Sequence, residues 1–240
     1  MDCLILAAGH GSRLRDISDS KPLTPVAGTP LIEHVLRAAL AAGATRFVVV
    51  TGHEAARVEA FVGGLAVRLE SAVEFVRLAD WDKPNGHSVL AGAARIEGDY
   101  LLLLSDHLFD PTLARRLIAA RPAEAALTLA VDRDWRRASL DLDDATKVAS
   151  ESGRILRIGK ALDAFDAVDT GVFVATPALA EALTAAVAAG EAGSLSQGVQ
   201  RLADQGRAAI VDVTGLMWLD VDDPAALAKA EALLAESRDG

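Results

Sequence analysis

Short, continuous runs of apolar residues alternate with amphipathic segments along the first half of the chain, and this alternation constrains the fold more than any other feature. Runs that are apolar at nearly every position are typical of strands buried on both faces of a parallel sheet. Five such runs are predicted to be strands: 3–8, 46–51, 73–76, 100–104 and 126–131. The pattern predicts an α/β fold with a Rossmann-like, doubly wound, mainly parallel sheet.

Helix signals fit between these strands. In residues 30–43 the apolar side chains recur at helical spacing, and Gly43 follows the last turn. Four dipeptides place a capping side chain directly before a proline, which predicts a helix start at each: Thr29-Pro30, Asp110-Pro111, Thr176-Pro177 and Asp223-Pro224. The last of these helices is expected to run from Pro224 to about Ser237.

After residue 132 the alternation weakens. Residues 132–160 favour a loop with short strands, predicted to form a small subsheet, and residues 167–176 favour another strand. The chain shows neither an internal repeat nor a linker-like stretch, so we expect residues 1–240 to form a single domain.

Charge and cysteine content restrict the class of protein. The net charge is −10, which argues against nonspecific binding to nucleic acid. The single cysteine, Cys3, lies in an apolar run and has no intrachain disulfide partner. The sequence shows no apolar run of the ~18 residues that span a bilayer and no signal peptide. We therefore expect a cytoplasmic protein without a membrane segment; nothing in the sequence specifies an oligomeric state.

The stretch LAAGHGSRL, residues 6–14, follows the first predicted strand. Two glycines let backbone N–H groups approach a phosphate closely. The dinucleotide-binding pattern is excluded because Leu14 stands where its third glycine is needed, and the chain lacks the Gly-Lys-Ser/Thr of a P-loop. Arg13 and Lys21, eight residues apart, are expected to meet a triphosphate from two sides. The alternative is a glycine-rich turn with solvated cations.

This loop, together with KPLTPVAGTPLI at 21–32, resembles the signature of the nucleotidyltransferases that activate sugar phosphates and alcohol phosphates. Stretches further along the chain are similar to the CTP:inositol-1-phosphate cytidylyltransferases: NGHSVL, SDH, ATKV, RIGK, FDAVDTGVFV and WLDVDD. Ser105 departs from the glycine that the family often has there. Members are often fused to a membrane-embedded transferase; because this sequence ends at Gly240, the next reaction is expected to belong to another protein.

The resemblance implies Mg²⁺-dependent transfer and assigns residues to it. Arg13, Lys21 and Asp106 are the candidate catalytic residues. Asp106 lies just beyond the carboxyl end of the predicted strand 100–104, and carboxylates suit Mg²⁺. A second metal carboxylate is expected from Asp220, with Asp222 as its rival. The structural alternative is that Asp106 caps the strand end and that the aspartates at 220–223 cap the last helix. The nucleotide site is expected to comprise Ala7, Ala8, Gly9, Gly11, Ser12, Arg13, Lys21, Asn85, Gly86 and Ser88, with Gly86 allowing close approach of the base.

The resemblance also implies an acceptor site in the second half of the chain, formed by Lys147, Lys160, Arg133, Asp169 and Thr170. The alternative is that the lysines are solvated surface residues and that Asp169 and Thr170 form a turn next to a strand. The implied reaction joins CTP and inositol-1-phosphate to CDP-inositol and pyrophosphate. Phosphocholine, which needs an aromatic cage that Trp81, Trp135 and Trp218 would have to form, and sugar-1-phosphates are alternative acceptors. A non-catalytic, regulatory binding domain is the alternative of another class.

Overall fold

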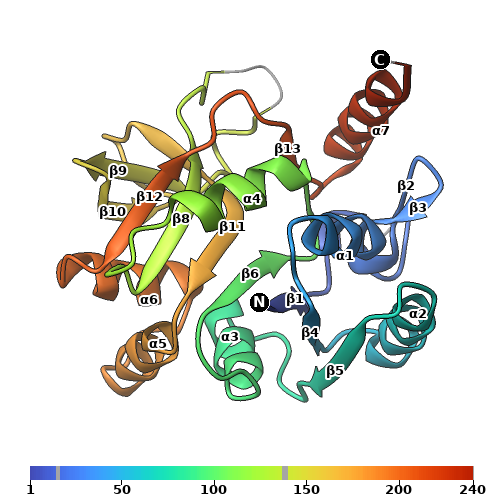
Figure 1. The fold of residues 1–240 in the computed structure, drawn as a ribbon, viewed down its shortest axis with the longest axis horizontal. Helices are drawn as coiled ribbons and strands as arrows, with labels where there is room; N and C mark the ends of the chain where they lie inside the picture. Colours follow the sequence, from blue (N-terminus) through green and yellow to red (C-terminus); the bar gives the residue numbers. More distant parts are fainter. Residues whose placement is uncertain (15–16, 137–139, 240) are drawn as a thin grey trace.

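The computed structural model describes residues 1–14, 17–136 and 140–239, leaving out the side chains of Ser12 and of residues 236–239. A nine-stranded sheet in the order β5-β4-β1-β6-β11-β8-β12-β10-β9 runs through it (Figure 1). Its strands are β1 (Asp2–Ala7), β4 (Arg46–Thr51), β5 (Ala72–Arg77), β6 (Tyr100–Leu104), β8 (Leu127–Asp132), β9 (Lys147–Glu151), β10 (Arg154–Gly159), β11 (Ala167–Ala175) and β12 (Ala208–Asp212).

The first four strands of this order are parallel and match the predicted runs. β1 pairs with β4 on one side and with β6 on the other, and β5 closes the edge. In β1 the side chains of Leu4 and Leu6 pack into one core cluster and those of Cys3 and Ile5 into another, on the opposite face. The continuous apolar pattern of this run therefore reflects burial on both faces, as expected. β5 differs because an edge strand has only one neighbour, and its residues are partly exposed.

The second half of the sheet is mixed rather than parallel. β11 runs antiparallel to β6 and β8, whereas β12 is parallel to β8. The predicted subsheet is the β9–β10 hairpin, which joins the main sheet through β12 and β11 instead of standing apart. The α/β class is thus confirmed, and the mainly parallel character holds only for the strands up to β6.

Helices cover both faces of the sheet, as a doubly wound fold requires. One core cluster includes buried residues of α3, α5 and α6, and the other includes those of α1, α2 and α4. The helices are α1 (Leu31–Ala41), α2 (Ala55–Arg68), α3 (Asn85–Ala93), α4 (Pro111–Ala120), α5 (Ala178–Ala188), α6 (Leu195–Asp204) and α7 (Pro224–Asp239). Among the described residues, none of these helices is both long and apolar enough to cross a membrane.

Two of the four predicted caps have the expected form. Asp110 accepts a hydrogen bond from the N–H of Thr112, and Asp223 accepts one from the N–H of Ala226. The prediction at Thr29 is wrong, because Thr29 pairs with Val26 in the small hairpin of β2 (Pro25–Val26) and β3 (Thr29–Pro30), and α1 begins at Leu31. The helix after Thr176 begins one residue later than predicted, with Pro177 as its N-cap.

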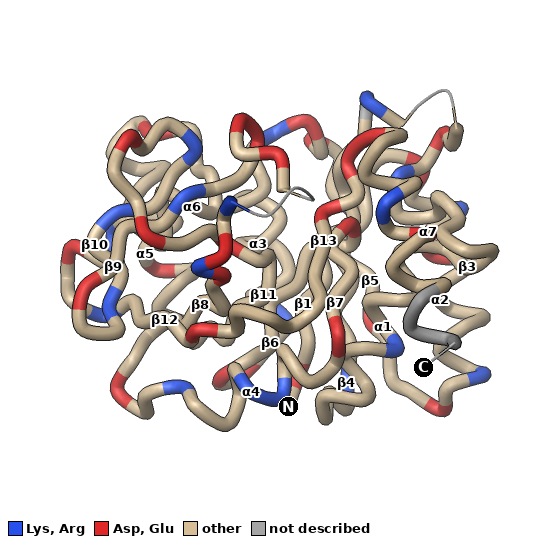
Figure 2. The backbone as a smooth tube through the Cα atoms, turned by 90° about the horizontal axis from the view of Figure 1, so that it is seen from above, with Lys and Arg blue, Asp and Glu red and all other residues tan. Residues whose placement is uncertain are grey.

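Short elements bring distant segments to one edge of the sheet. β7 (His107–Phe109) pairs antiparallel with β13 (Trp218–Asp220), so the segment after β6 lies beside the segment before α7. Two 3₁₀ turns, η1 (Ser12–Leu14) and η2 (Lys21–Leu23), follow β1. Acidic and basic residues are interspersed over the loops and helix ends (Figure 2).

Candidate functional site

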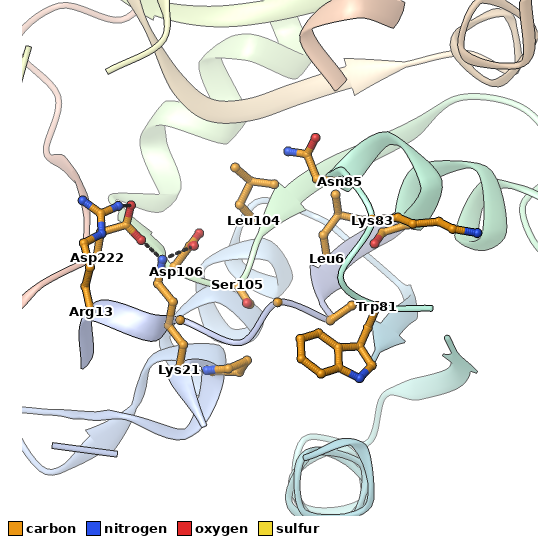
Figure 3. Close-up of a pocket in the computed structure, with 15 residues that line it drawn as sticks. Leu6, Arg13, Lys21, Trp81, Lys83, Asn85, Leu104, Ser105, Asp106 and Asp222 are labelled. Atoms are coloured by element: carbon orange, nitrogen blue, oxygen red, sulfur yellow. Dashed lines mark hydrogen bonds and ion pairs between the residues drawn. The ribbon is translucent and has the colours of Figure 1, made fainter. Parts of the chain in front are cut away.

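Two adjoining cavities lie beyond the carboxyl ends of β1 and β6, where ligands bind in open α/β sheets. The first, about 330 Å³, is lined by the loop after β1, by residues of α3 and the segment before it, and by Ser105 and Asp106 (Figure 3). The second, about 490 Å³, is lined mainly by residues from the second half of the chain. Arg13, Asn85, Leu104, Asp106 and Asp222 line both.

The two glycines of the opening loop have different roles. A Cβ at Gly11 would lie 2.3 Å from the Cβ of Lys21, and the residue has a φ of +65°, so only glycine fits there without strain. A Cβ at Gly9 would meet nothing within 4 Å, although Gly9 lines the first cavity. Gly11 therefore makes room for Lys21, while the open space at Gly9 is available to a ligand.

Lys21 extends from η2 into a group of carboxylates. Its Nζ lies 2.5 Å from Oδ2 of Asp106 and 4.0 Å from Oδ1 of Asp220, and it also forms an ion pair with Asp222. The lysine side chain is only 10% exposed, so the ammonium is largely removed from water and depends on these partners. The candidate catalytic pair Lys21–Asp106, 85 residues apart in the sequence, is thereby in direct contact.

His107 holds two of these carboxylates from the other side. The β7–β13 pairing sets His107 opposite Asp220, and its Nδ1 lies 2.8 Å from Oδ1 of Asp106 and 3.9 Å from Oδ1 of Asp220. Burial disfavours the charged ring, but Asp220 and Asp106 outweigh it and raise the pKa of His107 to about 9. Burial also opposes ionisation of Asp106, yet Lys21 and His107 hold its pKa well below the usual range.

The carboxylates fit a divalent metal ion. Asp106, His107 and Asp220 offer ligand atoms within 4.8 Å of one another, and so do Asp144, Asp220 and Asp222. Asp220 belongs to both groups, and its Oδ1 is buried without a hydrogen-bond partner among the described residues. A buried carboxylate oxygen without a hydrogen bond is costly unless a cation binds it directly, and the nearest cationic groups, Lys21 and His107, lie 4.0 and 3.9 Å away. This observation favours Asp220 over Asp222, whose two oxygens already pair with Arg13 and Lys21.

Arg13 links the opening loop to the second half of the chain. Its guanidinium lies 2.5 Å from Oδ2 of Asp144 and 2.5 Å from Oδ2 of Asp222. Asp144 also pairs with Lys160. The Lys160 and Arg13 hydrogen bonds lower the pKa of Asp144, with burial opposing them. Sequence reasoning missed both Asp144 and His107: Asp144 is one of three nearby aspartates with nothing in the sequence to distinguish it.

The first cavity includes many of the predicted nucleotide residues. Ala8, Gly9, Gly11, Asn85 and Ser88 line it. Ala7 does not, because alternation along β1 turns its side chain into the opposite core, and the side chain of Ser12 lies outside the description.

Gly86 does not line this cavity either. A Cβ there would lie 2.3 Å from the carbonyl oxygen of Gly193, so this glycine allows α3 to pack closely instead of admitting a base. Trp81, which does line the cavity, packs against the rings of His10 and His53.

The predicted acceptor residues divide into two groups. Lys160 and Asp169 line the second cavity, and burial raises the pKa of Asp169 to about 6. Lys147 does not line it, because its ammonium donates to the backbone carbonyl of Lys160. Thr170 is fully buried and donates to the carbonyl of Ala130.

Arg133 also lies outside both cavities. Its guanidinium pairs with Asp166 and Asp212 and donates to the hydroxyl of Ser150, so it ties neighbouring strands of the sheet together. The side chains of Lys147, Thr170 and Arg133, which were predicted to bind the acceptor, therefore do not line either cavity.

Phosphoryl transfer from a nucleoside triphosphate requires cations for the departing phosphates, carboxylates for a metal ion and space for two substrates at one point. This α/β sheet brings all three together at its carboxyl edge, which defines a nucleotidyltransferase. The chain belongs to the family of MobA-like NTP transferase domains, which it matches over residues 3–209.

Several proteins are similar to it over nearly its whole length. The "Bifunctional IPC transferase and DIPP synthase" of Rubrobacter xylanophilus is 34% identical over 235 residues, which is 96% of this chain and 51% of that protein. The inositol-1-phosphate CTP transferase from T. maritima has a structure with a TM-score of 0.87 and 26% identity, covering 100% of this chain and 96% of that one. UDP-glucose pyrophosphorylase, at 20% identity and a TM-score of 0.81 over 99% of both chains, shares the fold. The chain spans about half the length of the curated relatives it matches.

Proposed function

We propose that residues 1–240 form one nucleotidyltransferase domain that transfers the cytidylyl group of CTP to inositol-1-phosphate, with Mg²⁺ as the cofactor. An oxygen of the acceptor phosphate attacks the α-phosphorus, the bond from that phosphorus to the bridging oxygen breaks, and pyrophosphate leaves with the electron pair. The products are CDP-inositol and pyrophosphate. The acceptor phosphate is already largely ionised at neutral pH, so the attack needs no general base.

The observation that carries this proposal is the shared wall of the two cavities. One cavity is formed around the opening loop and the other by the second half of the chain, and Asp106, Arg13 and Asp222 border both. A nucleotide in the first cavity and a phosphorylated polyol in the second would present their phosphates to each other at this wall. The names of the relatives, an IPC transferase and an inositol-1-phosphate CTP transferase, support the choice of substrates.

The residues at the wall have complementary tasks. Asp106 and Asp220 would hold Mg²⁺, which when bound neutralises charge on the phosphates between which the group moves. Arg13 and Lys21 would bind the β- and γ-phosphates, where negative charge grows as the bond breaks, and so favour departure of pyrophosphate. In the free protein, Arg13 pairs with Asp144 and Asp222, and Lys21 pairs with Asp222. A bound triphosphate would replace these carboxylates as the partner of both cations.

Base recognition is assigned to the far end of the first cavity. Gly9 leaves open space there, and Ser88 on α3 offers a hydroxyl. Trp81 supplies an apolar ring at the same cavity. These groups can surround a base without adding charge near it.

The second cavity suits a phosphorylated polyol. Lys160 supplies a cation for the acceptor phosphate and Asp169 a carboxyl group for hydroxyls. An aromatic cage for phosphocholine is not assembled among the described residues. Trp81 lies at the first cavity, Trp135 packs on Phe165, and the indole N–H of Trp218 is bonded to Asp132.

A pyrophosphate-release screen tests the proposal. Each of the four ribonucleoside triphosphates is combined with inositol-1-phosphate, phosphocholine or a sugar-1-phosphate, with Mg²⁺ present and with each acceptor omitted in turn. We expect release only with an acceptor present, and the highest kcat/KM for CTP with inositol-1-phosphate. A higher kcat/KM for another pair would replace the substrates, and no release with any pair would contradict the proposed activity.

A further inference from the structure

Five of the described residues line both cavities, and Asn85 is the uncharged polar one among them. It is the first residue of α3, whereas Arg13 lies in η1, and Asp106 and Asp222 lie in the segments that follow β6 and β13. Ser88, one turn further along α3, lines the first cavity only. Asn85 therefore stands at the meeting point of the substrates rather than at the base end of the nucleotide cavity.

The orientation of its carboxamide follows from its hydrogen bond. The backbone N–H of Leu195, at the start of α6, lies 2.9 Å from Oδ1 of Asn85. Because an N–H can bond only to the acceptor end of the amide, the amide nitrogen must occupy the other position. In the part of the chain that the structure describes, this nitrogen has no partner. Figure 3 shows it on the side of the carboxamide that faces Arg13 and Asp106.

The backbone that carries Asn85 is held closely against α6. Gly86 packs directly on the carbonyl of Gly193, as described above, and Ser194 caps α6 through a reciprocal capping box with Gln197. The hydrogen bond from the Leu195 N–H to Oδ1 and the packing of the helix end fix the orientation of the Asn85 amide nitrogen, so this donor loses little freedom when a ligand binds. Such preorganised donors stabilise charge that develops in a transition state.

We infer that Asn85 is a catalytic residue that donates a hydrogen bond from its amide nitrogen to a phosphate oxygen at the junction, on the transferred phosphoryl group or on the attacking acceptor phosphate. This inference rests on the proposed function and assigns Asn85 a role in the transfer step instead of in base binding. Positioned donors of this kind carry much of the catalysis in phosphoryl transfer, where the protein supplies no covalent chemistry.

Two substitutions separate this role from a structural one. Asn85→Asp retains an oxygen for the Leu195 N–H but presents an anion to the phosphate, whereas Asn85→Ala removes both interactions. A donor role predicts that kcat falls about a hundredfold in Asn85→Ala and at least about tenfold further in Asn85→Asp, because a like charge replaces the donor. A purely structural role predicts the reverse order. Asp110→Ala, which removes the N-cap of α4 on the other face of the sheet, should lower Tm and leave kcat within about threefold.

The kinetic split separates the role from base binding. The Kd for CTP, measured without acceptor by calorimetry, should change by less than about threefold in Asn85→Ala, since a donor that acts on charge developing in the transition state contributes little to binding in the ground state. A large rise in this Kd with kcat unchanged would overturn the inference, as would kcat in Asn85→Asp equal to or above that of Asn85→Ala. Wild-type protein that releases no pyrophosphate would instead refute the proposed function, and the assigned role with it.

Discussion

Replacing the largely buried Lys21 with methionine should destabilise the free protein more than the same replacement of an exposed lysine. Its ammonium is the shared partner of Asp106 and Asp222, and these side chains are only 23% and 22% exposed. Removing one member of a buried ion pair costs about 3–5 kcal/mol, because the remaining charge is left uncompensated. Methionine keeps most of the apolar stem, so the loss is electrostatic. For a chain of this length, about 3 kcal/mol lowers Tm by roughly 6–12 °C.

Thermal unfolding in the presence of a chelator measures this effect. Adding Mg²⁺ should raise Tm more in Lys21→Met than in the wild type, because the ion no longer competes with the ammonium for the carboxylates. Lys83→Met is the matched control: Lys83 lines the same cavity, but its partner Asp80 is 69% exposed, so little change is expected. A fall in Tm below about 2 °C in Lys21→Met, or one equal to that of the control, would refute the reasoning.

Three further predictions follow from the same structure. Asp106→Ala should lower kcat by about 10²–10⁴-fold in the pyrophosphate assay; a near-normal rate at saturating Mg²⁺ would contradict its metal role. Lys160→Gln should raise the KM for inositol-1-phosphate roughly tenfold or more, with a smaller rise in Lys147→Gln, whose ammonium lies outside the cavity; equal effects would contradict the placement. The hydrogen bond from Arg77 lowers the pKa of Glu59, with burial opposing this shift and Thr51 assisting it. The ionised Glu59 therefore stabilises the folded protein above about pH 4.5, and this contribution is lost as the pH falls further. Glu59→Gln should weaken this acid dependence of Tm, and an unchanged pH profile would contradict it.

Much of the first half could be predicted because its signals are local. The run 100–104 is apolar at each position and matches β6, so the place of Asp106 beyond the strand followed directly. The spacing of Arg13 and Lys21 along one loop likewise indicated cations at the same edge. These features depend on neighbouring residues, which a sequence shows.

Long-range pairings were the part that the sequence did not indicate. The antiparallel direction of β11 and the β7–β13 pairing depend on the path of the whole chain. The contact of Asp144 with Arg13 joins residues 131 positions apart. For the same reason the acceptor roles of Lys147 and Arg133 were expected from the resemblance to the cytidylyltransferases, and their partners in the structure, the carbonyl of Lys160 and the carboxylate of Asp166, were not predicted.

Phosphorus NMR of the reaction mixture tests the central claim most directly. CTP, inositol-1-phosphate and Mg²⁺ are incubated with the wild-type protein, and with Asp106→Ala as the control. The account predicts that the signal of the acceptor monoester disappears while one pyrophosphate and one diphosphate diester, CDP-inositol, appear in equal amounts. Formation of CMP and pyrophosphate with the acceptor unchanged, or no consumption of CTP by the wild type, would contradict it.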